Sequence, residues 1–329
     1  MNRGSVRSSL ALIATAGLVA VALSGCTPAP EAPEATSGQS SDAVVVKGDF
    51  GDAPKVEFPA PLAPDETQCT EVIAGDGAKL QDGQQALIGL AVYNGTTGET
   101  VQEPTGFGDE DPIALTVSDA TLPGLRKALT CGSEGSRVAV VVPADDAFGD
   151  QGNESIGIGA DDSLVFVIDV KRALPSRADG APQLSRDGFP AVVLAPDGRP
   201  GITVPKADPP VKDEIAVEVL KKGSGEVVED GDSVVVQYTG VLWDDNSVFD
   251  STWTTAAEGN QQPGPKTFVV STGDDAQVIP GFSNAIIGQT VGSQIGVIVP
   301  SSQGYGDQGN DKVPAGSTLF FVIDILGVV

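Results

Sequence analysis

The side chains that usually carry enzyme chemistry are scarce in this chain. Its 329 residues contain no histidine, so the usual neutral-pH acid and base, the Ser-His and Cys-His nucleophile pairs and the commonest zinc ligand are absent. The acidic residues, among them Asp274-Asp275 and Glu154, show no calcium-loop spacing and are expected to form a solvated surface. We therefore expect no metal and no cofactor. With 19 basic against 45 acidic residues, the net charge of −26 also opposes nucleic-acid binding.

The N-terminal residues have the layout of an export signal. Arg3 and Arg7 precede an apolar stretch, 10–23, that is shorter than the roughly 20 residues a membrane span needs. Leu-Ser-Gly-Cys follows and resembles the lipobox of bacterial lipoproteins, which implies cleavage before Cys26 and a lipid on it. A plain secreted protein is the alternative. We therefore expect an extracytoplasmic protein that is anchored to the cell membrane by lipid.

The two remaining cysteines, Cys69 and Cys131, are expected in the same oxidising compartment. They favour a disulfide, which would close a loop of 62 residues and stabilise the fold by roughly 4 kcal/mol. Two buried free thiols are the alternative. A redox site is disfavoured because the chain lacks a Cys-x-x-Cys spacing.

The chain repeats itself. VVVPADDAFGDQGN, ending at Asn153, matches VIVPSSQGYGDQGN, ending at Asn310, and SLVFVIDV matches TLFFVIDI further along each half. The stretch PSRADGAPQLSR between the halves has the composition of a linker. We therefore divide the chain into a signal peptide (1–25), a lipidated cysteine with a disordered tether (26–50), a first domain (51–174), a linker (175–189) and a second domain (190–329).

Each unit is predicted to consist of antiparallel strands around one short helix. The strand segments of the second unit, rich in β-branched and aromatic residues, are 234–242, 294–299 and 318–326. The helix segment, 280–287, begins with proline and carries a narrow apolar stripe made by Phe282, Ala285 and Ile286. The first unit has the same stripe at Leu125, Ala128 and Leu129. Such a helix must dock on a sheet, which indicates an α+β fold.

Five sequence blocks of the second unit point to a family. They are Val-Gln-Tyr-Thr-Gly at 236–240, Val-Phe-Asp-Ser at 248–251, Val-Ile-Pro-Gly-Phe at 278–282, Gly-Tyr-Gly at 304–306 and Thr-Leu-Phe-Phe at 318–321. In this order they resemble the FKBP-type peptidyl-prolyl cis/trans isomerases. The resemblance implies two tandem FKBP-like domains, each an antiparallel β-sheet wrapped around a short α-helix.

The resemblance also implies a substrate pocket in the second unit. By position, the pocket residues would be Tyr238, Phe249, Asp250, Phe268, Val278, Ile279, Phe282, Tyr305, Val313 and Phe321. The apolar members would hold a proline ring, and the Ile279 backbone N–H and the Tyr305 hydroxyl would orient peptide carbonyls. Each apolar residue taken alone could equally be an ordinary core residue, and Asp250 a solvated turn carboxylate.

Two positions depart from the family pattern. Phe282 stands where many members have a tryptophan, which we expect to alter the fit more than abolish it. Lys312 occupies a loop position that is usually apolar, so it is unfavourable for the macrolide ligand that the resemblance allows.

The first unit lacks most of this pocket. Its matching positions hold Leu90, Val101, Gln102, Leu115, Leu125 and Phe148. Because both aromatic walls and both polar side chains are lost, we predict that this copy folds but does not isomerise.

Isomerisation of an X-Pro bond requires no proton transfer, which suits a chain without histidine. The barrier of about 20 kcal/mol comes from amide resonance. An apolar aromatic pocket without water favours the twisted transition state, which is less polar than the planar amide. The expected function is peptidyl-prolyl cis/trans isomerisation in Pro-containing segments of unfolded or exported proteins. The alternative is a non-catalytic chaperone or peptide-binding adaptor that uses the same groove.

Overall fold

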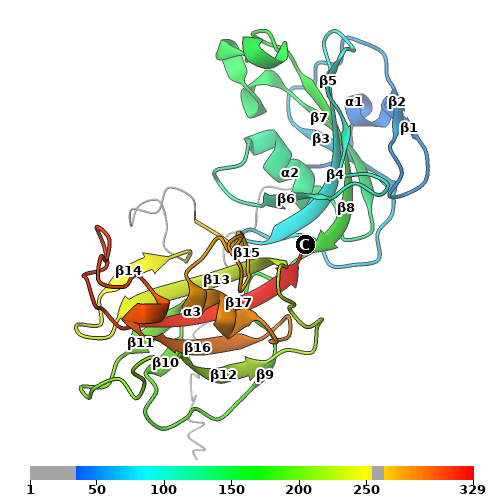
Figure 1. The fold of residues 1–329 in the computed structure, drawn as a ribbon. Coiled ribbons are helices and arrows are strands. Elements are labelled where there is room, and N and C mark those ends of the chain that lie inside the picture. Colours follow the sequence, from blue (N-terminus) through cyan, green and yellow to red (C-terminus); the bar gives the residue numbers. More distant parts are fainter. Residues whose placement is uncertain (1–34, 254–262) are drawn as a thin grey trace, which may run out of the picture. The chain divides into compact units, whose positions relative to one another are not determined.

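The computed structural model describes residues 35–253 and 263–329, which form two large antiparallel sheets and two separate two-stranded hairpins (Figure 1). The signal peptide expected at 1–25 and the lipidation expected at Cys26 lie outside the described residues. Within the two described ranges, no helix is long and apolar enough to cross a membrane.

The first domain is built on one sheet with the strand order β3-β7-β8-β4-β5, in which β6 also pairs with β4. Its strands are β3 (Gln68–Ile73), β4 (Gln85–Asn94), β5 (Thr100–Thr105), β6 (Ile113–Thr116), β7 (Arg137–Val142) and β8 (Leu164–Ala173). Three short 3-10 turns lie between β7 and β8, at Ala144–Asp146, Gly149–Gln151 and Glu154–Ile156. The long central strands β4 and β8 are rich in Val, Ile and Leu because both of their faces are covered.

The second domain repeats this arrangement. Its sheet has the order β14-β13-β17-β16-β12, extended by β9, and β15 pairs with β13. Its strands are β9 (Ala181–Pro182), β12 (Ala216–Lys222), β13 (Ser233–Leu242), β14 (Val248–Ser251), β15 (Lys266–Val269), β16 (Gln294–Val299) and β17 (Leu319–Val328). A 3-10 turn follows β16 at Ser301–Gln303. The predicted strands and the α+β class are confirmed.

One helix packs on one face of each sheet, which we call the helix face. Helix α2 (Pro123–Cys131) belongs to the first domain and α3 (Pro280–Ile286) to the second. Both helices begin with proline at a first-turn position, where no backbone N–H is needed. The predicted apolar stripes are confirmed, because all six of their residues are buried in the two cores: Leu125, Ala128, Leu129, Phe282, Ala285 and Ile286.

A β-hairpin covers the opposite face of each sheet, which we call the outer face. In the first domain this hairpin is β1 (Val45–Lys47) with β2 (Lys55–Glu57), and in the second it is β10 (Ala191–Leu194) with β11 (Pro200–Thr203). The second hairpin contributes Val192 and Ile202 to an apolar cluster around Trp243 and Phe320. Both faces of each sheet are therefore removed from water.

The expected tether, residues 26–50, needs correction for its described part. Residues 35–50 contain α1 (Gln39–Asp42) and β1, and Ser41 is completely buried. The Ser41 hydroxyl lies 2.8 Å from Thr70 Oγ1, and Gln68 Oε1 accepts a hydrogen bond from the Ser40 N–H at 2.9 Å. Small polar residues are ordered here because strand β3 satisfies their hydrogen bonds.

Residues 175–189, which were expected to be a linker, are partly packed on the second sheet. Ala178 is only 1% exposed, and β9 pairs with β12 at the edge of the second sheet. The small side chains permit this close approach, since a Cβ on Gly180 would lie 2.5 Å from the backbone of Lys222. The second domain therefore begins before residue 190.

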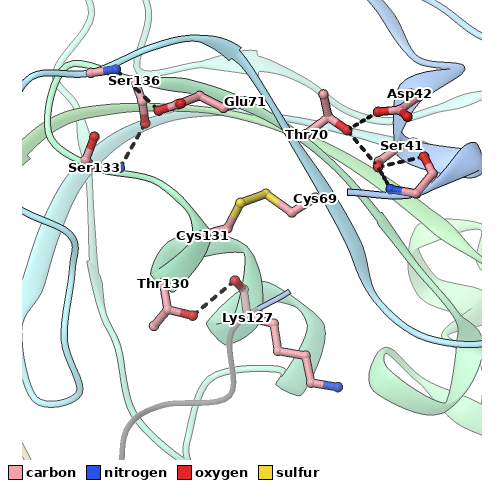
Figure 2. The surroundings of a disulfide bond; sticks show 12 residues. Ser41, Asp42, Cys69, Thr70, Glu71, Lys127, Thr130, Cys131, Ser133 and Ser136 are labelled. Carbon is pink, nitrogen blue, oxygen red and sulfur yellow. Dashed lines mark hydrogen bonds between the residues drawn. A yellow bond between two sulfur atoms is a disulfide. The ribbon is translucent and has the colours of Figure 1, made fainter. Parts of the chain in front are cut away.

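The predicted disulfide is present. Cys69 on β3 is bonded to Cys131 in the last turn of α2, across 62 positions of the chain (Figure 2). It attaches the helix to an edge strand of the first sheet. The matching positions of the second domain hold no cysteine.

We predict that the Cys69→Ala, Cys131→Ala double variant loses roughly 4 kcal/mol of unfolding free energy in the first domain only, since the bond restricts the unfolded chain there. Both tryptophans, Trp243 and Trp253, lie in the second domain, so their fluorescence reports that domain alone. In a urea titration, far-UV circular dichroism should show an early transition that tryptophan fluorescence does not follow. Two unshifted transitions would contradict this role of the disulfide.

Candidate functional site

A cavity of about 430 Å³ lies on the helix face of the second domain. Four strands, α3 and the segment before α3 supply most of its walls, and the loop after β16 supplies the rest. The lining residues are Tyr238, Phe249, Asp250, Phe268, Ala276, Gln277, Val278, Ile279, Phe282, Tyr305 and Phe321.

Five aromatic rings at this cavity form one connected cluster. The ring of Phe282 lies 5.5 Å from that of Tyr238 and 5.4 Å from that of Phe321, both edge to face. Phe249 meets Phe321 at 5.4 Å, and Phe268 lies 6.3 Å from Phe282. Edge-to-face pairs contribute about 0.5–1.5 kcal/mol each beyond the area they bury. The cluster is therefore a stiff apolar wall.

Gly240 permits this ring packing. It lies on β13 opposite Asp250 of β14 and Phe321 of β17. A Cβ at this position would lie 2.6 Å from the Phe249 ring and 2.8 Å from the Phe321 ring. Any side chain here would push the two rings apart, so the glycine is required by close approach.

The polar edge of the cavity is made by Tyr238 and Asp250. The Tyr238 hydroxyl donates a hydrogen bond of 2.6 Å to Asp250 Oδ2. Burial raises the pKa of Tyr238, and the hydrogen bond to the Asp250 carboxylate and its negative charge raise it further. Burial also raises the pKa of Tyr305, with a further contribution from Asp250. Both phenols therefore keep their protons at neutral pH and can act as hydrogen-bond donors.

The start of α3 fixes the other side of the cavity. Ile279 is the residue before the first helical turn, and its extended backbone turns the chain into Pro280. Gln277 anchors the preceding segment to β15, because its side-chain Oε1 accepts from the Val269 N–H and its backbone N–H donates to the Val269 carbonyl, both at 3.1 Å. Val278 and Ile279 are thereby held against the ring cluster.

Nine of the ten residues that the sequence predicted for the pocket surround this one cavity. The exception is Val313, which is buried in the core and does not line it. The side chain of Asn310 accepts hydrogen bonds from the N–H groups of Lys312 and Val313, both at 2.8 Å, and this turn directs Val313 into the core. Ala276 and Gln277 line the cavity without having been predicted, although they directly precede the Val-Ile-Pro-Gly-Phe block.

Comparisons with known proteins agree with this geometry. The family model described as "FKBP-type peptidyl-prolyl cis-trans isomerase" matches residues 78–171 and 225–326, once in each domain. The chain belongs to this family. An FK506-binding protein of Streptomyces anulatus is 31% identical over 132 residues, which are 40% of this chain and 97% of the relative. FKBP14 of Mus musculus is 35% identical over 117 residues, which are 35% of this chain and 52% of that protein.

Among solved structures, the three FKBP domains of wheat FKBP73 match with a TM-score of 0.34 and 21% sequence identity. That match covers 80% of this chain and 94% of the wheat chain.

The first FKBP domain fills the equivalent region mainly with aliphatic side chains, although Phe148 and Phe166 are aromatic there. Leu90 and Leu125 are buried in its core, and Val101, Leu115 and Phe148 pack against them. The ring pair found in the described part of this domain is Phe58 with Tyr93, at 6.2 Å, and both rings pack with the β1–β2 hairpin on the outer face. The two FKBP domains thus have sheets of the same topology but differ in the side chains that face the helix.

We predict that the tyrosines of the folded protein ionise at higher pH than the ordinary phenol pKa of about 10. Burial raises the pKa of all three tyrosines, Tyr93, Tyr238 and Tyr305. Each raised pKa favours folding below about pH 10, and this contribution is lost as the pH rises through the folded-state value. Absorbance at 295 nm should rise later in buffer than in concentrated urea. Coincident curves would contradict the burial of these phenols.

Proposed function

We propose that the second FKBP domain isomerises X-Pro bonds in the aromatic cavity and that the first domain is not catalytic. The observation that carries this proposal is the cavity lined by the ring cluster with one polar edge, Tyr238 beside Asp250, in the second domain alone among the described residues. The first domain, with Leu90 and Leu125 at the matching positions, would brace the chain or bind unfolded segments.

The proposed catalysis is a change of surroundings for the peptide bond. A planar X-Pro amide is polar because of resonance, and water stabilises it. At the twisted transition state the resonance is lost and the carbonyl carries less charge. An apolar cavity that replaces water therefore favours the transition state over the planar amide, without any covalent step.

Each cavity residue would have a role that follows from its position. Phe282, at 3% exposure, and Phe321, also at 3%, would form the floor beneath the proline ring. The hydroxyl of Tyr305 and the backbone N–H of Ile279 would hold the flanking carbonyls, so that the chain turns about the X-Pro bond. Asp250, fixed by Tyr238, would present a carboxylate to the twisting carbonyl side of the substrate.

The rival function is a peptide-binding module that grips Pro-containing segments without accelerating their exchange. The same cavity supports it, since apolar pockets with a few polar groups are also ordinary binding sites. The two functions differ only in whether the transition state is bound more tightly than the planar amide.

We predict that the full chain accelerates cis/trans exchange of a Leu-Pro peptide, measured by NMR exchange spectroscopy. The Asp250→Ala, Phe282→Ala double variant should lose at least about 100-fold in kcat/KM, because both the floor and the polar edge are removed. The matched control is Leu125→Ala, the same truncation at the equivalent helix position of the first domain, which should leave exchange catalysis unchanged.

Three outcomes would overturn the proposal. Peptide binding by the wild-type chain with unchanged exchange would leave only the binding function. Full catalysis by the double variant would remove the cavity from the mechanism, and a loss in Leu125→Ala would place catalysis in the first domain.

We also propose that the substrates are exported polypeptides, which the protein would bind on the extracytoplasmic side of a cell membrane. This rests on the sequence alone, in which Cys26 follows Leu-Ser-Gly after an apolar stretch. The mass of the mature N-terminal peptide tests it, because a lipid on Cys26 adds the mass of its acyl chains and an unmodified cysteine would exclude the anchor.

A further inference from the structure

A row of buried polar side chains crosses the outer face of the second sheet. Gln294, Asp324 and Gln237 lie directly opposite one another on β16, β17 and β13, and the half-buried Lys221 of β12 continues the row. Gln237 is 4% exposed and Asp324 1%. The Gln294 side chain donates to Asp324 Oδ1 at 2.6 Å, and burial raises the pKa of Asp324. Buried polar groups of this kind need partners to offset their desolvation.

The partners come from the segment that precedes β9. The Ala178 N–H donates to Asp324 Oδ2 at 2.8 Å, and the Ala178 carbonyl accepts from Lys221 Nζ at 2.8 Å. The Ser176 carbonyl accepts from Gln237 Nε2 at 2.9 Å. Residues 176–178 are therefore bound to the sheet by three side chains from three strands.

The row continues from Gln237 to the cavity. Gln237 Oε1 accepts from the hydroxyl of Thr252 at 3.1 Å, and Thr252 is 3% exposed. The same hydroxyl oxygen accepts from the backbone N–H of Tyr238 at 2.9 Å. The Tyr238 carbonyl, at 3.3 Å, is a longer alternative acceptor for the hydroxyl and already receives the Thr252 N–H at 3.0 Å. Thr252 thus joins Ser176, through Gln237, to the residue that carries the cavity phenol.

The first domain has the row without its last step. Arg137 and Asp169 form a fully buried ion pair at the positions of Gln294 and Asp324, and they bind the turn of the β1–β2 hairpin through Gly48 and Gly51. The position of Gln237 is taken by Gly89, also opposite the aspartate. A Cβ there would lie 2.7 Å from the Phe107 ring, which fills the space. The first domain, which has no aromatic cavity among its described residues, therefore also lacks the hydrogen bonds that Gln237 and Thr252 make in the second domain.

From this contrast we infer that Gln237 and Thr252 are positioning residues of the isomerase site, which hold Tyr238 through its backbone N–H and tie it to the segment around Ser176. The inference rests on the proposed function, because it concerns the rate at which that site works. Tyr238 can present its hydroxyl to Asp250 at 2.6 Å only while its strand segment keeps its place between β17 and Thr252. A shift of the phenol would misplace the polar edge relative to the twisting amide, and small misplacements in an active site are costly in rate.

The test uses the full chain and the Leu-Pro exchange assay. Thr252→Val keeps the shape of the side chain but removes the hydroxyl, and it should lower kcat about tenfold with KM little changed, since the site would be misaligned and not blocked. The amide proton of Tyr238, assigned by NMR, should move upfield and exchange faster with solvent. Thr252→Ser should restore the rate and the amide signal together, and Gln237→Met should weaken both.

Thr290→Val is the matched control, because it removes a hydroxyl that donates to the Gly223 carbonyl at 2.9 Å, in the same domain but outside this chain of hydrogen bonds. It should lower thermal stability to a similar extent and leave kcat unchanged. A kcat for Thr252→Val within twofold of the wild type, despite a shifted Tyr238 amide signal, would overturn the inference. So would an equal loss in Thr290→Val, or no recovery in Thr252→Ser. If the wild-type chain itself is inactive, the proposed function fails instead.

Discussion

The edge-to-face packing of aromatic rings around one cavity is the constraint on which the rest of the second domain depends. The rings of Phe282, Phe321 and Phe249 can meet edge to face only because β13 carries glycine at position 240. The helix that supplies Phe282 must dock on the sheet to bury its narrow apolar stripe. The β10–β11 hairpin packs on the apolar residues of the outer face. A single polar pair, Tyr238 with Asp250, interrupts this apolar lining at its edge.

Comparison of the two domains distinguishes the residues that the fold requires from those that the cavity requires. Both domains keep the strand order, the proline-initiated helix and a buried aspartate that receives a backbone N–H from a covering segment. These features stabilise the sheet in either copy. Tyr238, Phe282 and the step from Gln237 to Thr252 occur in the second copy. The first copy has Leu90, Leu125 and Gly89 at the positions of Tyr238, Phe282 and Gln237. The first copy instead carries the Cys69–Cys131 bond, which fits a structural role.

Much of the fold could be predicted from local sequence signals, whereas the cavity residues were predicted from the resemblance of five sequence blocks to the FKBP family. The strands follow from runs of β-branched residues, and the stripe on α3 follows from the spacing of Phe282, Ala285 and Ile286. Val313, which the resemblance places in the pocket, is buried in the core and does not line the cavity, because Asn310 holds the turn that directs it inward. The segment around Ala178 has the composition of a linker, and only the three-dimensional sheet shows that small residues permit its close approach. The roles of Gln237 and Thr252 depend in the same way on contacts between residues far apart in the chain.

The central claim is that the cavity accelerates rotation about the X-Pro bond by its apolarity and not by proton transfer. The most direct measurement is the solvent deuterium isotope effect on kcat/KM of the full chain for a Leu-Pro peptide. The account predicts equal rates in H₂O and D₂O, because no bond to an exchangeable proton changes in the transition state. A clear normal isotope effect would contradict it, since a titratable side chain would then take part in the reaction.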